Sequence, residues 1–80
     1  MNLIRQFDVF DKLSDKLKDE IVINNLDIET VKGLVDLIDN DPELYNAYQV
    51  KGDLKNYFEN KGYTFEMEKY DYFLACYQDN

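Results

Sequence analysis

The sequence predicts an all-α fold: a compact bundle of four to five short helices that forms a single domain over residues 1–80. Two observations predict it. Apolar residues recur at steps of three and four along several stretches, which is the spacing that lines one face of a helix. The chain has 80 residues, of which 45% are hydrophobic, so it has room for one small core and no second domain.

An N-terminal helix is expected over residues 1–24. Its apolar side chains are Leu3, Phe7, Phe10, Leu13, Leu17 and Ile21. At 100° per residue they fall within an arc of about 80°. On the opposite, solvated side lie Asp8, Asp11, Asp15 and Asp19. The β-branched residues 21–23 would also suit a short strand, so the end of this helix stays open.

The next two helices are predicted from their caps. Asp27 is a suitable N-cap for a helix over residues 28–39. The stretch Asp-Pro-Glu-Leu at residues 41–44 combines a capping aspartate, a proline suited to the first helical position and a glutamate that favours the positive end of a helix. A short third helix is therefore expected over residues 42–48.

Two further helices complete the expected bundle. Asp53 would cap a fourth helix that ends near Asn60, and Gly62 would then take the left-handed conformation that ends a helix. The apolar spacing predicts a fifth helix over residues 66–78. A strand competes with it, because residues 64–72 are aromatic-rich and partly alternating.

Composition excludes several classes of function. Seventeen acidic and nine basic residues give a net charge of −8, which repels nucleic acid phosphates and anionic lipids. The chain contains no histidine, the usual general base and a common zinc ligand. Neither a membrane span nor an export signal is recognisable, so we expect a cytoplasmic protein without enzymatic activity, cofactor or metal. The single cysteine, Cys76, is expected to be a small buried hydrophobe.

Three stretches carry a resemblance to a known family. They are LVDLIDNDPEL at residues 34–44, LKNYFENKGYTF at residues 54–65, and a closing segment through Tyr70 and Leu74. In these stretches the chain resembles nitrogen-fixation-associated leader peptides, small helical leaders that precede certain ribosomally made natural products.

This resemblance implies a helical scaffold over residues 34–74 that a larger protein recognises, with residues 1–24 as an extra helix. It implies no catalytic residue. The double-glycine cleavage site and the core peptide typical of such leaders do not occur in the sequence. A precursor peptide is therefore not expected.

The combination of negative charge and tyrosines predicts a surface that binds another protein. Carboxylates beside exposed tyrosines suit an arginine-rich partner, through ion pairs and cation–π contacts. The predicted partner-binding residues are Asp8, Asp11, Asp15, Asp19, Asp36, Asp39, Asp41, Glu43, Tyr45, Tyr48, Tyr63 and Tyr72. Tyr57, Tyr70 and Tyr77 are instead expected in the core.

The favoured hypothesis is an inhibitor or regulator of the kind that phages and mobile elements use against host defence. It would mimic DNA phosphates and occupy the basic surface of a nucleic-acid-binding protein. The alternative is a leader-like module that docks an enzyme modifying ribosomal natural products. A third hypothesis is a small scaffold that forms a homodimer.

Overall fold

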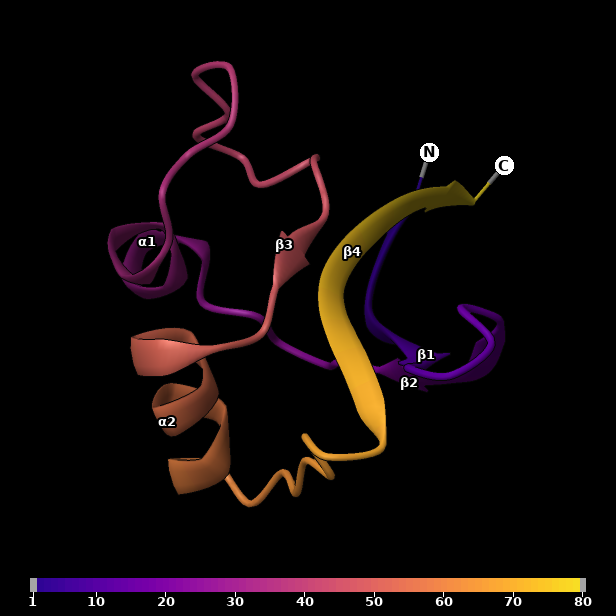
Figure 1. Ribbon diagram of the computed structural model, residues 1–80. Coiled ribbons are helices and arrows are strands. Elements are labelled where there is room, and N and C mark those ends of the chain that lie inside the picture. Colours follow the sequence, from indigo (N-terminus) through magenta and orange to yellow (C-terminus); the bar gives the residue numbers. More distant parts are fainter. Residues whose placement is uncertain (1, 80) are drawn as a thin grey trace.

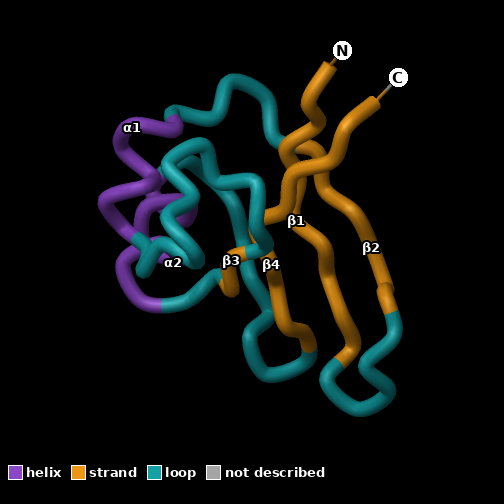
Figure 2. Tube along the Cα trace, turned by 90° about the horizontal axis from the view of Figure 1, so that it is seen from above, coloured by secondary structure: helices purple, strands orange, loops and turns teal. Residues whose placement is uncertain are grey.

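The chain forms an antiparallel sheet with two short helices, so the prediction of an all-α bundle is wrong. The computed structural model describes residues 2–79. The strands are β1 (Asn2–Asp11), β2 (Leu17–Val22), β3 (Tyr48–Gln49) and β4 (Tyr70–Asp79), in the sheet order β2-β1-β4-β3. The helices are α1 (Ile28–Val31), which continues as the 3-10 turn η1 (Lys32–Leu34), and α2 (Gly52–Asn60). Figures 1 and 2 place both helices on the side of β3 and β4 and leave β2 at the opposite edge.

A β-hairpin replaces the helix predicted over residues 1–24. In β1, Phe7 and Val9 are buried in the core, whereas Asp8 lies between them on the other face, as a strand requires. Leu13, which the helical spacing assigned to the core, is 98% exposed in the turn between β1 and β2. Asp15 in that turn adopts the left-handed conformation, with φ of 59°, which aspartate tolerates better than most residues. The open strand alternative at residues 21–23 is right for Ile21 and Val22.

The predicted caps are partly correct, but the helices after them are shorter than expected. Asp27 caps α1, since its carboxylate accepts a hydrogen bond from the Thr30 backbone N–H at 3.2 Å. The helix predicted over residues 28–39 nevertheless ends within η1, and residues 42–48 form a loop and β3 instead of a third helix. The fourth helix is confirmed as α2, followed by Gly62 with φ of 100°. Its N-cap is Lys51 and not Asp53, which lies in the first turn.

The last segment is a strand, so the fifth helix predicted over residues 66–78 is wrong. The competing strand interpretation was right in kind, although β4 begins only at Tyr70. β4 pairs with β1 along the whole of both strands, from Asn2 opposite Asp79 to Asp11 opposite Tyr70. Tyr72 and Leu74 alternate onto the core face, which is the two-residue period that a half-buried strand needs.

One face of the sheet, the inner face, holds the core. Its central residue is Phe7, which is fully buried, and its ring meets the rings of Phe58, Tyr63 and Phe65 edge-on at 4.8, 5.3 and 5.4 Å. Phe58 lies on α2, so these contacts attach the helix to the sheet. Cys76 is partly buried. Within the described residues, no helix is long and apolar enough to cross a membrane.

The opposite face of the sheet is the outer face. Residues paired across strands share a face, so the register assigns the side chains. The outer face carries Ile4, Gln6, Asp8, Phe10, Leu17, Glu20, Val22, Asp71, Phe73, Ala75 and Tyr77. None of its apolar side chains belongs to the core cluster. Within residues 2–79, no helix therefore covers the outer face, although Gln6, Asp8 and Ala75 on it are only 6%, 5% and 5% exposed.

Candidate functional site

Residues 35–47 connect η1 to β3 without forming a helix or a strand, and we call this segment the Asp41 loop. Asp41 lies at its centre and is 7% exposed. Its carboxylate accepts hydrogen bonds from the backbone N–H groups of Tyr45 (2.9 Å) and Asn46 (2.8 Å) and from the Tyr48 hydroxyl (2.9 Å). The aspartate predicted to cap a helix thus organises a loop in the same way, by accepting backbone N–H groups.

Hydrogen bonds determine the protonation of this centre. Burial raises the pKa of Asp41, but the donors of Asn46, Tyr45 and Tyr48 outweigh it, and the pKa is lowered overall. Burial, together with the neighbouring Asp41 carboxylate, raises the pKa of the Tyr48 hydroxyl. Asp41 is therefore ionised and Tyr48 neutral at pH 7, which is the pairing that the hydrogen bond between them needs.

The loop has an unusual backbone. Asp39, Asn40 and Leu44 adopt left-handed conformations, with φ of 51°, 53° and 56°. For a side chain as large as that of Leu44, this conformation costs about 1–2 kcal/mol. Burial of Leu44, which is 1% exposed, offsets the cost. Arg5 offsets the cost further, because its guanidinium donates to the backbone carbonyls of Leu44 and Glu43.

The loop exposes its other large and charged side chains. Leu37 and Ile38 are 41% and 42% exposed. Asp36, Asp39 and Glu43 are also exposed, and within residues 2–79 none of these three takes part in an ion pair. The loop thus presents apolar and anionic groups together on a backbone held in a single conformation.

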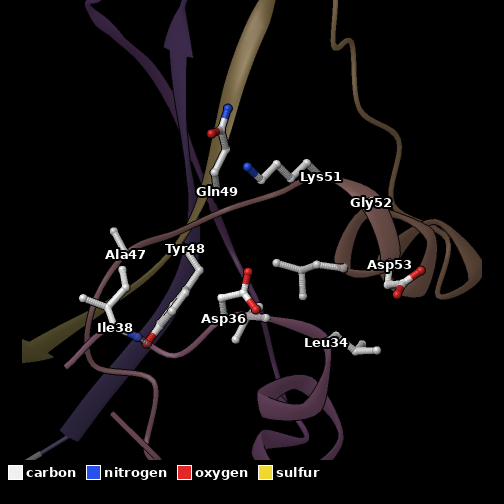
Figure 3. A pocket seen from close by; sticks show the side chains of 11 residues that line it. Leu34, Asp36, Ile38, Ala47, Tyr48, Gln49, Lys51, Gly52 and Asp53 are labelled. Carbon is white, nitrogen blue, oxygen red and sulfur yellow. Dashed lines mark hydrogen bonds between the residues drawn. The ribbon is translucent and has the colours of Figure 1, made fainter. Parts of the chain in front are cut away.

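A groove of about 470 Å³ lies between the Asp41 loop and the start of α2, and Figure 3 shows the side chains around it. Its lining residues are Leu34, Val35, Asp36, Ile38, Ala47, Tyr48, Gln49, Lys51, Gly52, Asp53 and Leu54. The lining includes the apolar side chains of Leu34, Val35, Ile38 and Leu54, the carboxylates of Asp36 and Asp53, and the amine of Lys51. An apolar groove that carries a few charged groups is the usual form of a binding site.

The structure brings together half of the predicted partner-binding residues. Six of them lie in the Asp41 loop or directly after it: Asp36, Asp39, Asp41, Glu43, Tyr45 and Tyr48. The other six are dispersed: Asp8, Asp11, Asp15 and Asp19 lie in the hairpin, Tyr63 follows α2, and Tyr72 lies in β4. The predicted column of four aspartates does not form, because Asp8 and Asp19 lie on opposite faces of the sheet.

Exposure differs from the expectation at several of these positions. Tyr48 and Tyr72 are each 4% exposed, so they form part of the core and not of a contact surface. Asp8 and Asp41 are also buried. Conversely, Tyr77, which was expected in the core, is 47% exposed. The errors at Asp8, Tyr72 and Tyr77 share one cause, since a helical period assigns alternate strand residues to the wrong side. Asp41 lies in a loop, and it is buried where its carboxylate accepts hydrogen bonds.

Sequence reasoning missed Arg5, Leu37 and Ile38 as residues of this site. Arg5 lies 38 residues before Glu43 in the chain, so only the tertiary fold reveals the contact. Its guanidinium also lies 5.7 Å from the centre of the Tyr45 ring. The sequence does contain a signal for a loop here, the run Asp-Asn-Asp-Pro at residues 39–42, because these residue types favour turns.

The described residues contain no group of three or more histidine, cysteine, aspartate or glutamate side chains placed to hold a metal ion. Residues 4–75 match a family model described as a domain of unknown function (DUF7683). No curated protein and no solved structure matches the chain significantly. These comparisons do not bear on the resemblance to leader peptides, which stays a prediction, although the helical scaffold that it implied is not the fold of this chain.

Proposed function

The chain belongs to the DUF7683 family of domains of unknown function, and we propose that it is a non-enzymatic module that binds a basic surface of another protein through the Asp41 loop and the adjoining groove. The observation that carries this proposal is the exposure of unpaired carboxylates and large apolar side chains on a loop whose centre is buried and hydrogen-bonded.

The groove suits a long basic side chain. Lysine and arginine combine an apolar stem with a cationic end. Leu34, Val35 and the exposed Ile38 offer apolar surface for the stem, and the carboxylates of Asp36 and Asp53 offer anionic groups for the end. The net charge of −8 attracts a basic protein over longer distances and accelerates the encounter.

The fixed conformation of the loop supports a binding role. Ordering a flexible loop on binding costs affinity, whereas a loop that is already ordered avoids this cost. Asp41 orders the loop through three hydrogen bonds, and Arg5 ties it to β1. The Ile38 backbone N–H donates to the Tyr48 hydroxyl, and the Asn46 amide donates to the Ile38 carbonyl, so this centre positions the exposed Leu37 and Ile38 for contact with a partner.

We favour as partner a protein that uses the same basic surface to bind nucleic acid. Occupation of that surface by this acidic module would exclude phosphates, so the module would act as an inhibitor or regulator. The argument rests on charge and shape, and it needs no reactive group in the module.

The test is a charge reversal with a matched control. The variant carries Asp36→Lys, Glu43→Lys and Asp53→Lys, and the control carries the same charge change at Asp19, Glu29 and Glu68, which are exposed elsewhere. Proteins captured from a host lysate are identified, and the most enriched basic one is purified for binding measurements.

The variant with lysine in the loop and groove should bind that protein at least about tenfold more weakly than the control. Binding by the unaltered chain should weaken between 50 and 500 mM salt, and excess DNA should compete with it. Equal binding by both variants, or binding that salt does not change, would reject the proposed function.

A further inference from the structure

The outer face of the sheet is a second surface with the properties of an interaction site. Leu17, Val22 and Tyr77 are 51%, 57% and 47% exposed there. Both helices lie away from β2, as Figure 2 shows, and the core cluster includes no apolar side chain of this face. Sheets bury their apolar faces against another layer, and residues 2–79 supply no helix for this face.

A pair of carboxylates lies at the centre of the outer face. Asp8 in β1 is directly opposite Glu20 in β2. Gln6 Nε2 donates to both of them, to Asp8 Oδ1 at 2.7 Å and to Glu20 Oε2 at 2.6 Å. The Tyr77 hydroxyl donates to the other oxygen of Asp8. Because one amide nitrogen reaches both carboxylates, the two negative charges lie close together.

This pair lacks a cation. Of the ion pairs within residues 2–79, none includes Asp8 or Glu20. Asp8 is only 5% exposed, and a buried charge is normally compensated by an opposite charge. Gln6 and Tyr77 supply neutral hydrogen-bond donors alone. A cationic group from outside the chain would complete the arrangement, and Glu20 remains exposed to receive it.

We propose that the outer face docks an amphipathic helix of another protein, with an arginine at its centre over Glu20 and Asp8 and apolar residues over Val22 and Tyr77. The guanidinium has five donors in a planar fork, which suits two neighbouring carboxylates. A helix is the element that covers the inner face of this sheet, and it suits the outer face for the same reason.

A second copy of the chain is the wrong occupant for this face. Pairing two outer faces would bring the carboxylates of both copies toward one another. Each copy also carries a net charge of −8, so long-range repulsion would add to the local one. Tyr77 lines a pocket together with Tyr45 of the Asp41 loop, but Asp8, Glu20 and Val22 lie on β1 and β2, outside that loop. This inference therefore does not depend on the function proposed for the loop.

The test is an NMR titration of the isotope-labelled chain with two synthetic peptides. Both are 16-residue helices of leucine, alanine and glutamine with leucines on one face. One has arginine at the centre of that face, and the other has citrulline, which keeps the shape and removes the charge.

The arginine peptide should shift the backbone amides of β1, β2 and β4 around Asp8 and bind at least tenfold more tightly than the citrulline peptide. The double variant Asp8→Asn, Glu20→Gln should bind both peptides equally. If the double variant fails to fold, Glu20→Gln alone, at an exposed position, should still reduce the ratio of the affinities for the arginine and citrulline peptides. Val22→Lys, also exposed, should weaken binding of the arginine peptide at least tenfold.

Other results overturn the inference. They are equal affinity for the two peptides, shifts confined to the Asp41 loop, no binding up to millimolar peptide, and a dimer of the free chain in sedimentation that Val22→Lys dissociates. Shifts confined to the loop would leave the function proposed for the loop intact.

Discussion

Replacing Tyr48 by phenylalanine tests whether buried hydrogen bonds hold the Asp41 loop. The Tyr48 hydroxyl donates to Asp41 Oδ2 at 2.9 Å and accepts from the Ile38 backbone N–H at 3.1 Å. Tyr48 is 4% exposed, so its ring is part of the core. The substitution removes one oxygen atom and keeps the ring in the core.

The structure sets the expected size of the effect. A hydrogen bond to a charged group contributes about 1.5–3 kcal/mol, and one between neutral groups contributes about 0.5–1.5 kcal/mol. Asp41 keeps the N–H groups of Tyr45 and Asn46, so its charge is not left without donors. We expect Tyr48→Phe to lower the free energy of unfolding by about 2–3 kcal/mol, which lowers Tm by roughly 10–20 °C in a domain of this size.

The assay is thermal and urea unfolding followed by circular dichroism, with amide exchange at Ile38 as the local measurement. Tyr45→Phe is the matched control, because Tyr45 is 56% exposed and its ring can remain beside Arg5. The control should change stability by less than about 0.5 kcal/mol. If Tyr48→Phe is no less stable than the control, or if exchange at Ile38 does not accelerate, the loop is not held as described.

Three further predictions concern ionisation and the core. The pKa of Asp41 is lowered in the folded chain, so its contribution to stability is present above pH 4 and is lost as the pH falls through the folded value. In urea titrations, acid should therefore destabilise the natural chain more than the Asp41→Asn variant. The hydrogen bond to Asp8 and, after it, burial raise the pKa of Tyr77 to about 12. The resulting stabilisation is present below pH 10 and declines between pH 10 and 12. In titrations followed by tyrosinate absorbance, Asp8→Asn should lower the titration midpoint of Tyr77 toward about 10. Phe7→Ala should cost about 3–5 kcal/mol in urea unfolding, whereas Leu13→Ala should cost less than about 0.5 kcal/mol; similar costs would favour the helix over the hairpin.

The sequence predicts the local signals of this fold better than its class. Asp27 and Gly62 mark real helix boundaries, and α2 lies where its apolar spacing predicts. Caps and stops depend on a few neighbouring atoms, so a single sequence is enough to locate them.

The class of the fold was missed because two periods overlap in the first strand. Phe7 and Phe10 fit a helical face, yet the alternation of Phe7 and Val9 decides the structure and leaves Phe10 on the outer face. The choice between the two periods depends on β4, whose residues lie far along the chain. Tertiary pairing of this kind overrides local preference.

The candidate site was predicted in part for a similar reason. The cluster of acids at residues 36–43 is visible in the sequence, and the structure keeps Asp36, Asp39 and Glu43 exposed. Their arrangement depends on Arg5 and on the left-handed backbone of Leu44, which no local pattern specifies. Charge can be read from composition, whereas the shape of a loop depends on contacts between distant segments.

The pairing of β1 with β4 has a consequence for how the chain reaches its native state. The two central strands of the sheet lie at residues 2–11 and 70–79, so the contacts that join them have a large separation along the chain. The hairpin of β1 and β2 would assemble from local contacts. The other edge of β1, which pairs with β4 in the native sheet, would stay unpaired until β4 closes the long loop between the two strands. Such closure is slow, and the unpaired edge of β1 is a template for aggregation. During folding, the chain is therefore most vulnerable before residues 70–79 join the sheet.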